Sequence, residues 1–154
     1  MLKKKVVNYH QLLEVFTGLA QATRFLRQDE AFCEGTTFHQ FLILDVLAKN
    51  RKLKMADLHR HLAVEKSTTT RLVNPLIKKK LLQRRADPDD LRAAYLTLTK
   101  KGEETHKNVR RCIMDFFHEA MGNIPEKKME NVLTSVNLFI GAIKAYTQQS
   151  ACCR

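Results

Sequence analysis

The chain has 154 residues, of which 44% are hydrophobic, and a formal net charge of +11. This suits one compact globular domain, or one domain with helical extensions. It has no run of about 18 apolar residues for a membrane span, and the basic start lacks the apolar segment and cleavage site of a secretory signal. We therefore expect a cytoplasmic protein without a membrane partner.

The first third of the chain predicts two helices. Apolar residues recur at steps of three and four from Val6 to about Phe32, which is typical of a helix. Cys33-Glu34-Gly35 is expected to end it, because glycine accepts a positive φ without steric cost. Thr36 or Thr37 then caps a second helix that runs to about Asn50 and is apolar on several sides.

Residues 51–98 predict a helix-turn-helix followed by a wing. The expected elements are an edge strand at 51–54, a short helix at 55–63, a turn at 64–66, a second helix to about 80, and strands at 81–86 and 93–98. The segment between the two strands is rich in Pro and Asp, which favour a tight turn.

Two long amphipathic helices are expected after the wing. Thr99 caps the first, which continues to about Gly122, and Asn123 to Pro125 separates it from a helix over 126–148. With the helix at the start of the chain, these carry more apolar surface than a winged unit can cover. Helices of this kind usually hide that surface against a second copy, so we expect a homodimer. The second helices of the two helix-turn-helix units would then lie about 34 Å apart, a spacing of one DNA turn that suits a palindromic site.

The second helix of the pair divides into two faces. At 100° per residue, Thr69, Leu72, Val73 and Leu76 share one face, and Ser67, Arg71, Asn74 and Lys78 share the other. The second face carries donors that read base edges and hold phosphates, and it lacks a carboxylate. An ordinary solvated helix surface is the alternative interpretation of this helix on its own.

The distribution of charge favours nucleic acid as the partner. Residues 51–92 contain twelve Lys or Arg against five acidic residues, so most of the excess positive charge lies in about a quarter of the chain. A basic surface for acidic lipid is disfavoured, because the cations do not line one long amphipathic helix.

One residue of this helix breaks the usual rules. Pro75 has no N–H for the carbonyl of Arg71, and its ring crowds that carbonyl, at a cost of roughly 3 kcal/mol in a regular helix. We therefore predict a bend or a water-bridged break between Arg71 and Pro75.

The cysteines and histidines do not form a metal site by spacing, and we expect no cofactor. The four cysteines, Cys33, Cys112, Cys152 and Cys153, fit no zinc pattern and are expected to be free thiols. A redox or thiophilic-metal sensor is the alternative, with Cys152 and Cys153 as its most accessible thiols. The chain also lacks the nucleophile, phosphate-loop and His-Glu-x-x-His motifs of common enzymes, so we expect no catalysis.

From about Phe38 to Lys107 the chain resembles the MarR family of winged-helix regulators. The likeness is carried by Ser67-Thr68-Thr69-Thr70-Arg71-Leu72-Val73, by the segment from Leu81 to Arg92 with its Asp-x-Arg wing tip, and by the strand that ends Leu98-Thr99-Lys100-Lys101-Gly102. Two positions depart from the family pattern. Lys80 occupies a position usually held by glycine, and the first helix of the pair begins at Lys54-Met55 without a Ser or Thr cap.

The resemblance implies a mainly α fold with a small β-wing, a winged helix-turn-helix flanked by N- and C-terminal dimerisation helices. Their expected ranges are 1–35, 36–100 and 101–154. It also implies a sequence-specific transcriptional regulator, usually a repressor that releases DNA when it binds a small phenolic or anionic ligand. An architectural or protein-interaction winged helix without operator specificity is a further alternative.

The expected sites follow from the helix faces and the resemblance. Arg92 would enter the minor groove, and Asp90 would orient it by a charge-assisted hydrogen bond. The full set of expected DNA contacts is Lys66, Ser67, Thr68, Thr70, Arg71, Asn74, Lys78, Arg84, Arg85, Asp90 and Arg92. The residues expected to line an effector pocket are Tyr9, Phe16, Arg24, His39 and Tyr95, with Arg24 as the anion anchor.

Overall fold

The structure is a computed structural model of the chain and describes residues 9–22, 31–62, 64–86 and 94–150. The chain divides into two compact units, residues 1–112 and 113–154. The described strands and the helix-turn-helix belong to the first, which we call the winged unit. The second holds the end of helix α5 and helix α6.

The first helix is shorter than the sequence predicts. Helix α1 spans Tyr9–Ala22. Residues predicted to continue it instead form strand β1 (Ala31–Cys33), which pairs antiparallel with strand β2 (Thr36–Thr37). Positive φ angles at Glu34 (49°) and Gly35 (64°) make the turn between the strands. Cys33-Glu34-Gly35 therefore closes a hairpin rather than a helix, and the prediction of a helix to Phe32 is wrong.

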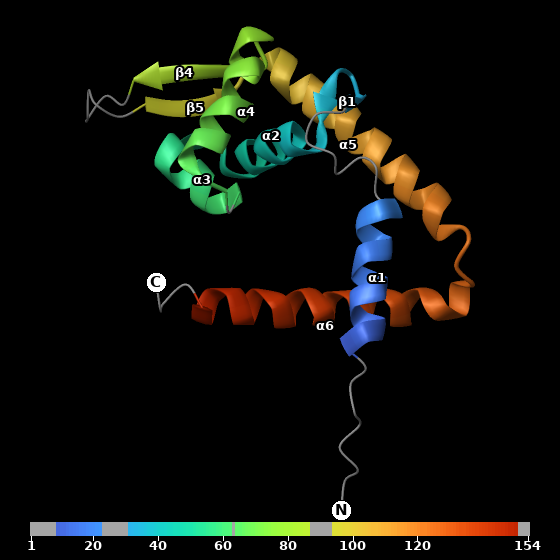
Figure 1. Cartoon of the computed structure of the whole chain (residues 1–154). Coiled ribbons are helices and arrows are strands. Elements are labelled where there is room, and N and C mark those ends of the chain that lie inside the picture. Colours follow the sequence, from blue (N-terminus) through green and yellow to red (C-terminus); the bar gives the residue numbers. More distant parts are fainter. Residues whose placement is uncertain (1–8, 23–30, 63, 87–93, 151–154) are drawn as a thin grey trace, which may run out of the picture. The chain divides into compact units, whose positions relative to one another are not determined.

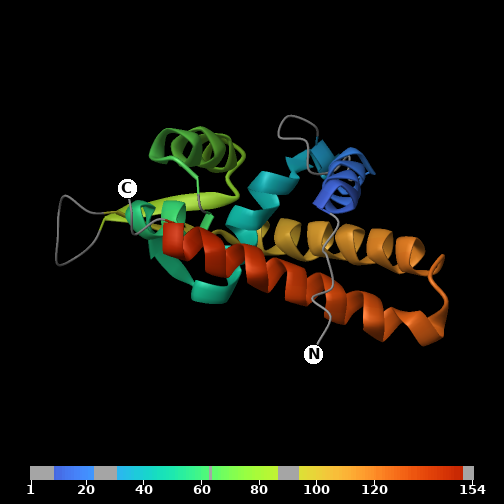
Figure 2. The same cartoon turned by 60° about the horizontal axis from the view of Figure 1, so that its bottom comes forward.

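Helix α2 (Phe38–Asn50) begins where the sequence places it. The Thr37 hydroxyl accepts from the Gln40 N–H at 3.2 Å, and the Gln40 side chain accepts from the Thr37 N–H at 3.3 Å. This reciprocal capping box satisfies two N–H groups that a helix start leaves unpaired. The views in Figures 1 and 2 agree that α2 lies between the helix-turn-helix and the first half of α5.

The helix-turn-helix and the three-stranded sheet follow the predicted order. Helix α3 spans Met55–Leu62 and helix α4 spans Lys66–Lys78. The sheet has the order β3–β5–β4 and is antiparallel throughout, with β3 (Lys52–Lys54) at one edge, β5 (Ala94–Leu98) in the centre and β4 (Leu82–Ala86) at the other edge. The predicted edge strand and the two wing strands are confirmed.

The core of the winged unit joins α2, α3, α4 and the sheet. Its members are buried aliphatic side chains: Ile43, Leu44, Leu47, Leu58, Val73, Leu76, Leu81, Leu82 and Leu96. Each such side chain contributes roughly 1.5–3 kcal/mol when it is removed from water. Because Val73 and Leu76 belong to this cluster, burial holds α4 against the unit by the face that the sequence marks as apolar.

Helix α4 is not broken at Pro75. It is continuous from Lys66 to Lys78, and the Pro75 carbonyl still accepts from the Lys79 N–H at 2.9 Å. Proline removes one N–H donor, and here the acceptor left over is the carbonyl of Arg71, an exposed residue that water can reach. The prediction of a break is therefore wrong, while that of a bend stays a prediction.

The end of α4 is closed by a Schellman motif with a lysine in the left-handed position. The Leu81 N–H donates to the Leu76 carbonyl and the Lys80 N–H to the Ile77 carbonyl, both at 2.9 Å. Lys80 has φ +59°, the conformation for which this motif usually selects glycine. The helix end thus closes with a positive φ, at the position where the family pattern has glycine.

The junction between the wing and helix α5 (Lys100–Met121) rests on Leu81. Its carbonyl accepts from the Thr99 N–H at 3.0 Å, and the Thr99 hydroxyl caps α5 by accepting from the Gly102 N–H at 3.0 Å. A Cβ on Gly102 would lie 2.0 Å from the Leu81 carbonyl oxygen. The Leu-Thr-x-x-Gly motif therefore combines a helix cap with a backbone approach that only glycine permits.

The last helix, α6, spans Glu126–Ser150 and follows a break after Met121, as predicted. Large apolar side chains are exposed on it, among them Leu133, Val136, Ile140 and Ile143. No helix in the described ranges is long and apolar enough to cross a membrane.

The expectation of free thiols is wrong for two of the four cysteines. Cys33 at the end of β1 and Cys112 on α5 form a disulfide between residues 79 positions apart in the chain. The hairpin turn places Cys33 against α5, an arrangement that the sequence alone did not predict. Cys152 and Cys153 lie outside the described residues.

We predict that Lys80→Gly stabilises the protein by about 1 kcal/mol, because glycine adopts the left-handed conformation without the cost that a side chain carries. The control is Lys78→Gly, at a neighbouring exposed lysine inside the helix, which should destabilise by about 1 kcal/mol. Urea unfolding followed by circular dichroism measures both changes. A Lys80→Gly protein no more stable than the parent would contradict the strain that we assign to this turn.

Candidate nucleic-acid interface

The outer face of α4 carries four exposed polar side chains. Thr69, Val73 and Leu76 are buried, whereas the opposite stripe of Ser67, Arg71, Asn74 and Lys78 is exposed. The division of the helix into two faces is as predicted. The stripe offers a hydroxyl, a guanidinium, an amide and an ammonium, all at the surface and all on one rigid element.

The other predicted contacts on α4 and the wing vary in their surroundings. Lys66 and Thr70 are exposed, and the Thr70 hydroxyl donates to the Lys66 carbonyl at 3.0 Å, which leaves its oxygen to accept. Thr68 is half-buried. Arg84 and Arg85 are exposed on β4. Asp90 and Arg92, the predicted wing tip, lie outside the described residues.

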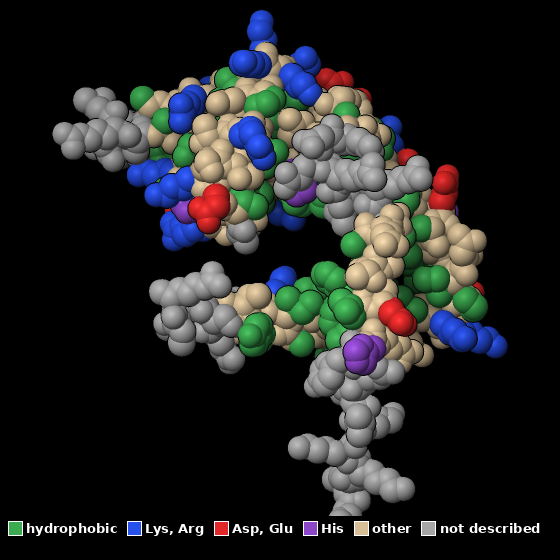
Figure 3. Space-filling model, in the orientation of Figure 1, with side chains coloured by type: hydrophobic (Ala, Val, Ile, Leu, Met, Phe, Trp, Pro, Cys, Tyr) green, Lys and Arg blue, Asp and Glu red, His purple; other side chains and the backbone are tan. Residues whose placement is uncertain are grey.

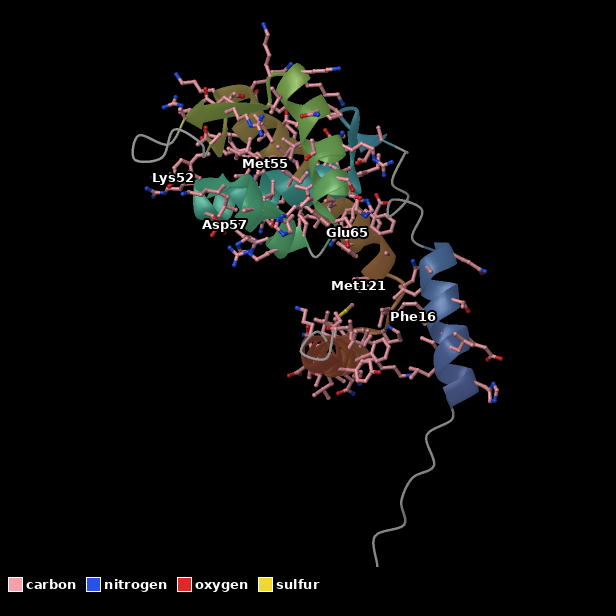
Figure 4. The ribbon with its side chains drawn as sticks, turned by 60° about the vertical axis from the view of Figure 1, so that its left-hand side comes forward. Phe16, Lys52, Met55, Asp57, Glu65 and Met121 are labelled. Atoms are coloured by element: carbon pink, nitrogen blue, oxygen red, sulfur yellow. A yellow bond between two sulfur atoms is a disulfide. The ribbon has the colours of Figure 1, made fainter. Side chains whose placement is uncertain are left out.

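The surface around α4 is strongly basic. Figure 3 shows Lys and Arg side chains scattered over the face that α3 and α4 present. Asp57, one of the few acids there, forms an ion pair with Arg60 on the same helix. Figure 4 shows Asp57 beside Lys52 at one side of the unit and Glu65, the residue before α4, at the other. Neither acid stands on the exposed stripe, so the stripe itself is suited to a polyanion.

The start of α4 adds a feature that we did not predict. Glu65 is its N-cap residue but makes no side-chain cap hydrogen bond. The first N–H groups of a helix have no partner within it, and together with the helix dipole they attract phosphate oxygens. The absence of Ser, Thr, Asp or Asn at position 65 is the sequence signal that could have pointed to this.

A second basic feature missing from the prediction lies on the edge strand. The ammonium groups of Lys52 and Lys54 stand 4.8 and 5.4 Å from the centre of the Tyr95 ring, at cation–π distance. The ring thus holds two cations on the same sheet as Arg84 and Arg85. The contact depends on the register of β3 against β5, which pairs Lys54 with Tyr95 and which the local sequence pattern does not specify.

A cavity of about 390 Å³ lies beside the end of α2. It is lined by Leu47, Ala48, Arg51, Leu98, Glu103, His106 and Lys107. Its lining combines apolar side chains with the cations Arg51 and Lys107 and the carboxylate of Glu103. In the described part of the chain, no group of three or more His, Cys, Asp or Glu side chains is placed to bind a metal ion.

The residues predicted to line an effector pocket are not among those of this cavity. Phe16 is exposed on α1, and Tyr95 lies under Lys52 and Lys54. His39 has a buried Nδ1 without a hydrogen-bond partner in the described ranges. Arg24 and the side chain of Tyr9 lie outside the part that the structure describes.

Next to the cavity, Asp45 joins α2 to α5. Its carboxylate accepts from Lys49 Nζ at 2.5 Å and lies 3.1 Å from His106 Nε2 and 3.6 Å from Arg110 Nη1. His106 in turn stacks on the Phe41 ring. Burial acts to raise the pKa of Asp45, but the hydrogen bonds and charges of Lys49 and His106 outweigh it, so that this pKa lies below its ordinary value.

Comparison with known proteins shows what the chain is similar to. Residues 34–93 match the sequence profile of the MarR family. Uncharacterized HTH-type transcriptional regulators of Staphylococcus aureus are 26% identical over 102 residues, which are 65% of this chain and 70% of the relative. In sequence, the part of the chain that holds the helix-turn-helix thus resembles the MarR family.

Solved structures share the fold. The PcaV transcriptional regulator from Streptomyces coelicolor is 21% identical with a TM-score of 0.73, and the match covers 87% of this chain and 98% of that protein. Streptococcus pneumoniae FabT, solved in complex with DNA, is 20% identical with a TM-score of 0.66, over 88% and 99% of the two chains. Bordetella bronchiseptica BpsR, whose DNA binding is regulated by 6-hydroxynicotinic acid, is 19% identical with a TM-score of 0.68, over 84% and 98%.

We predict that Asp45→Asn lowers the melting temperature at neutral pH and that its deficit relative to the parent disappears in acid. A carboxyl group whose pKa is lower in the folded protein than in the unfolded chain stabilises the fold. This stabilisation is complete above the pKa of the unfolded chain, roughly 4, and is lost as the pH falls through the pKa of the folded protein. Thermal unfolding between pH 7 and pH 3 tests this.

The control is Asp57→Asn, which removes the carboxylate of a local, exposed pair on α3 and should change the melting temperature much less at neutral pH. Melting curves of Asp45→Asn and the parent that stay equally far apart down to pH 3 would contradict the assignment.

Proposed function

We propose that this chain is a MarR-family, sequence-specific transcriptional regulator that binds palindromic duplex DNA as a homodimer. The observation that carries the proposal is the exposed stripe Ser67, Arg71, Asn74 and Lys78, free of carboxylates, on a helix whose other face is fixed in the core. A major groove admits a helix of this kind, with Arg directed to guanine and Asn to adenine. Lys66, Thr68 and Thr70 extend the contacts at its start.

The wing completes the proposed contact with DNA. Arg84 and Arg85, exposed on β4, would hold phosphates. In the proposal Arg92 enters the minor groove and Asp90 orients its guanidinium. The uncapped first N–H groups of α4 supply a further phosphate contact, which fixes the start of the reading helix over the backbone.

The helices outside the winged core support the dimer. Exposed large apolar side chains occur on all three: Leu13, Val15, Phe16 and Leu19 on α1, Met114, Phe116 and Phe117 on α5, and Leu133, Val136, Leu138, Ile140, Ile143 and Tyr146 on α6. A monomer in water rarely exposes so much apolar surface. We propose residues 1–35 and 101–154 as the dimerisation segments and 36–100 as the DNA-binding domain.

The regulator in our proposal is a repressor relieved by a small phenolic or anionic ligand. PcaV has been solved with its natural ligand, and BpsR responds to 6-hydroxynicotinic acid. The proposed pocket residues are Tyr9, Phe16, Arg24, His39 and Tyr95. The cavity lined by Arg51, His106 and Lys107 also combines basic with apolar side chains, and we propose it as a second place for such a ligand.

The central prediction concerns Arg71. Selection from random duplex DNA should yield a palindrome, and Arg71→Ala should weaken binding to it by about 1–3 kcal/mol, roughly tenfold to a hundredfold, with relaxed preference at the base that it reads. Fluorescence anisotropy on the selected duplex and on single-base variants measures both effects.

The matched control is Arg111→Ala, which removes an exposed arginine of α5 that is hydrogen-bonded to Asn108. It carries the same change in net charge and should leave affinity and base preference nearly unchanged. If selection yields no preferred sequence, the architectural alternative holds instead.

We further predict that Ile140→Lys dissociates the dimer, because a charge in an apolar interface loses its hydration without gaining a partner. Light scattering after size exclusion should give twice the 17.8 kDa chain mass for the parent and a lower mass for the variant at the same concentration. Asn131→Lys, on the opposite face of α6 by helical spacing, is the control and should remain dimeric. A parent that elutes as a monomer at micromolar concentration would overturn the dimer.

A further inference from the structure

The cavity beside the end of α2 is enclosed by three elements of the winged unit. Its walls come from the last turn of α2 and the residue after it, from the end of β5 and from the start of α5. Small-molecule sites in proteins have volumes of roughly 300–1,000 Å³. With about 390 Å³, the cavity lies near the lower end of this range and suits a small ligand.

One wall of the cavity is apolar and fixed in place. Leu47 belongs to the buried core of the winged unit, and Leu98 packs against that core. The ring of His106 stacks on Phe41 with 5.7 Å between the ring centres, and its Nε2 lies 3.1 Å from the carboxylate of Asp45. Because each of these side chains is held by its neighbours, the wall is formed before a ligand arrives.

Charges of both signs stand around the apolar wall. Arg51 and Lys107 are exposed cations, and Glu103 carries an exposed carboxylate. Glu103 and Lys107 are four positions apart on α5, a spacing that often produces an ion pair. Among the residues that the structure describes, neither they nor Arg51 forms an ion pair. The cavity therefore offers two cations and one anion that do not neutralise one another.

The backbone holds Arg51 at this cavity in a strained conformation. Arg51 is the C-cap residue of α2, its N–H donates to the Leu47 carbonyl at 2.8 Å, and its φ and ψ are +63° and −47°. Glycine adopts a positive φ without difficulty, whereas a residue with a Cβ is strained there. Strain of this kind is often stored at functional sites. An arginine at this position places a guanidinium at the cavity, which glycine cannot do.

We propose that the cavity binds an apolar α-amino acid as its zwitterion. The carboxylate of the ligand pairs with Arg51 and Lys107, and its ammonium group pairs with Glu103. The side chain of the ligand lies on Leu47 and Leu98. A simple carboxylic acid leaves Glu103 unpaired beside a like charge, and a simple amine leaves both cations unpaired, so the cavity disfavours each of them.

The inference rests on the ligand response proposed above and names the ligand class for the second of its two places. None of the residues predicted for the effector pocket lines this cavity. Arg51 directly precedes β3, which leads into α3 of the helix-turn-helix. A ligand bound here therefore contacts the segment of chain that carries the DNA-binding helices.

Isothermal titration calorimetry and thermal unfolding of the full chain test the site with L-leucine, L-methionine and L-phenylalanine. We expect at least one of them to bind and to raise the melting temperature, because a ligand that binds only the folded state stabilises it. Analogues then remove one charged group at a time. For leucine, 4-methylpentanoate lacks the ammonium group and 3-methylbutylamine lacks the carboxylate. Each analogue should bind roughly tenfold more weakly or worse, because a charge-assisted contact is lost.

Arg51→Gly separates a ligand contact from a structural role. Glycine relieves the strain, so the variant should melt about 3 °C higher than the parent, while its affinity for the amino acid should fall roughly tenfold. The control is Lys80→Gly, at another exposed residue with a positive φ, which does not line the cavity. This change should raise the melting temperature in the same way and leave the affinity for the amino acid unchanged.

Glu103→Gln tests the contact with the ammonium group. The variant should lose the preference for leucine over 4-methylpentanoate, because its amide carries no charge to pair with the ammonium group. Glu104→Gln removes the neighbouring exposed carboxylate of α5, which does not line the cavity, and should keep the preference.

The site is overturned if none of the three amino acids binds at millimolar concentration, or if the parent binds 4-methylpentanoate as tightly as leucine. Unchanged affinity for the amino acid in Arg51→Gly also overturns it. Binding is measured without DNA, and the affinity of the parent for the selected duplex is measured alongside. A parent that binds the duplex but no amino acid contradicts the site alone, whereas one that binds an amino acid but no duplex supports the site and contradicts the DNA-binding function.

Discussion

The winged unit depends on the carbonyl of one residue, Leu81, at the end of the turn after helix α4. Its amide closes α4 on the Leu76 carbonyl, its side chain enters the core, and its own carbonyl accepts from Thr99 and approaches Gly102. Helix α4, strand β4 and helix α5 therefore meet at a single peptide. Since a Cβ at position 102 would stand 2.0 Å from that oxygen, the junction has no room to adjust. Helix α4 is positioned by this rigid joint and by the core beneath it, rather than by contacts on its outer face.

Because packing does not constrain the outer face of α4, its side chains are available to bind a ligand. Arg71 and Asn74 contribute nothing to the buried cluster, so their positions are set by the backbone of α4 alone. Preorganised donors on a rigid helix lose little conformational freedom when they meet a base edge. The same separation of roles holds for Asp45, which secures α2 to α5 behind the helix-turn-helix, and for the hairpin at residues 31–37, which lies between α5 and the end of α4.

Local sequence signals predict much of this fold. The predictions that failed at the first helix and at the cysteines concern segments whose structure is decided by contacts with other parts of the chain. Thr36 or Thr37 and Thr99 are predicted as caps because a helix start needs a side-chain acceptor within three residues, and the structure uses Thr37 and Thr99. The faces of α4 followed from periodicity. The helix predicted to Phe32 failed because pairing of β1 with β2 decides that segment, and the Cys33–Cys112 bond depends on a contact across 79 residues. Pro75 predicts a bend or a water-bridged break in α4, but the helix is continuous, because proline removes the N–H donor only for the carbonyl of Arg71, an exposed residue. The roles of Arg71, Asn74 and Arg92 in binding DNA remain predictions.

The central claim is that α4 reads bases in the major groove, and chemical removal of major-groove acceptors tests it most directly. Replacing purines of the selected half-site one at a time by 7-deazapurines deletes the N7 acceptor without changing the minor groove or the charge. We expect a loss of about 1–3 kcal/mol at the purine that Arg71 contacts and no further loss there in Arg71→Ala. Equal affinity for all 7-deaza duplexes, or a loss that is the same in Arg71→Ala, would contradict the account.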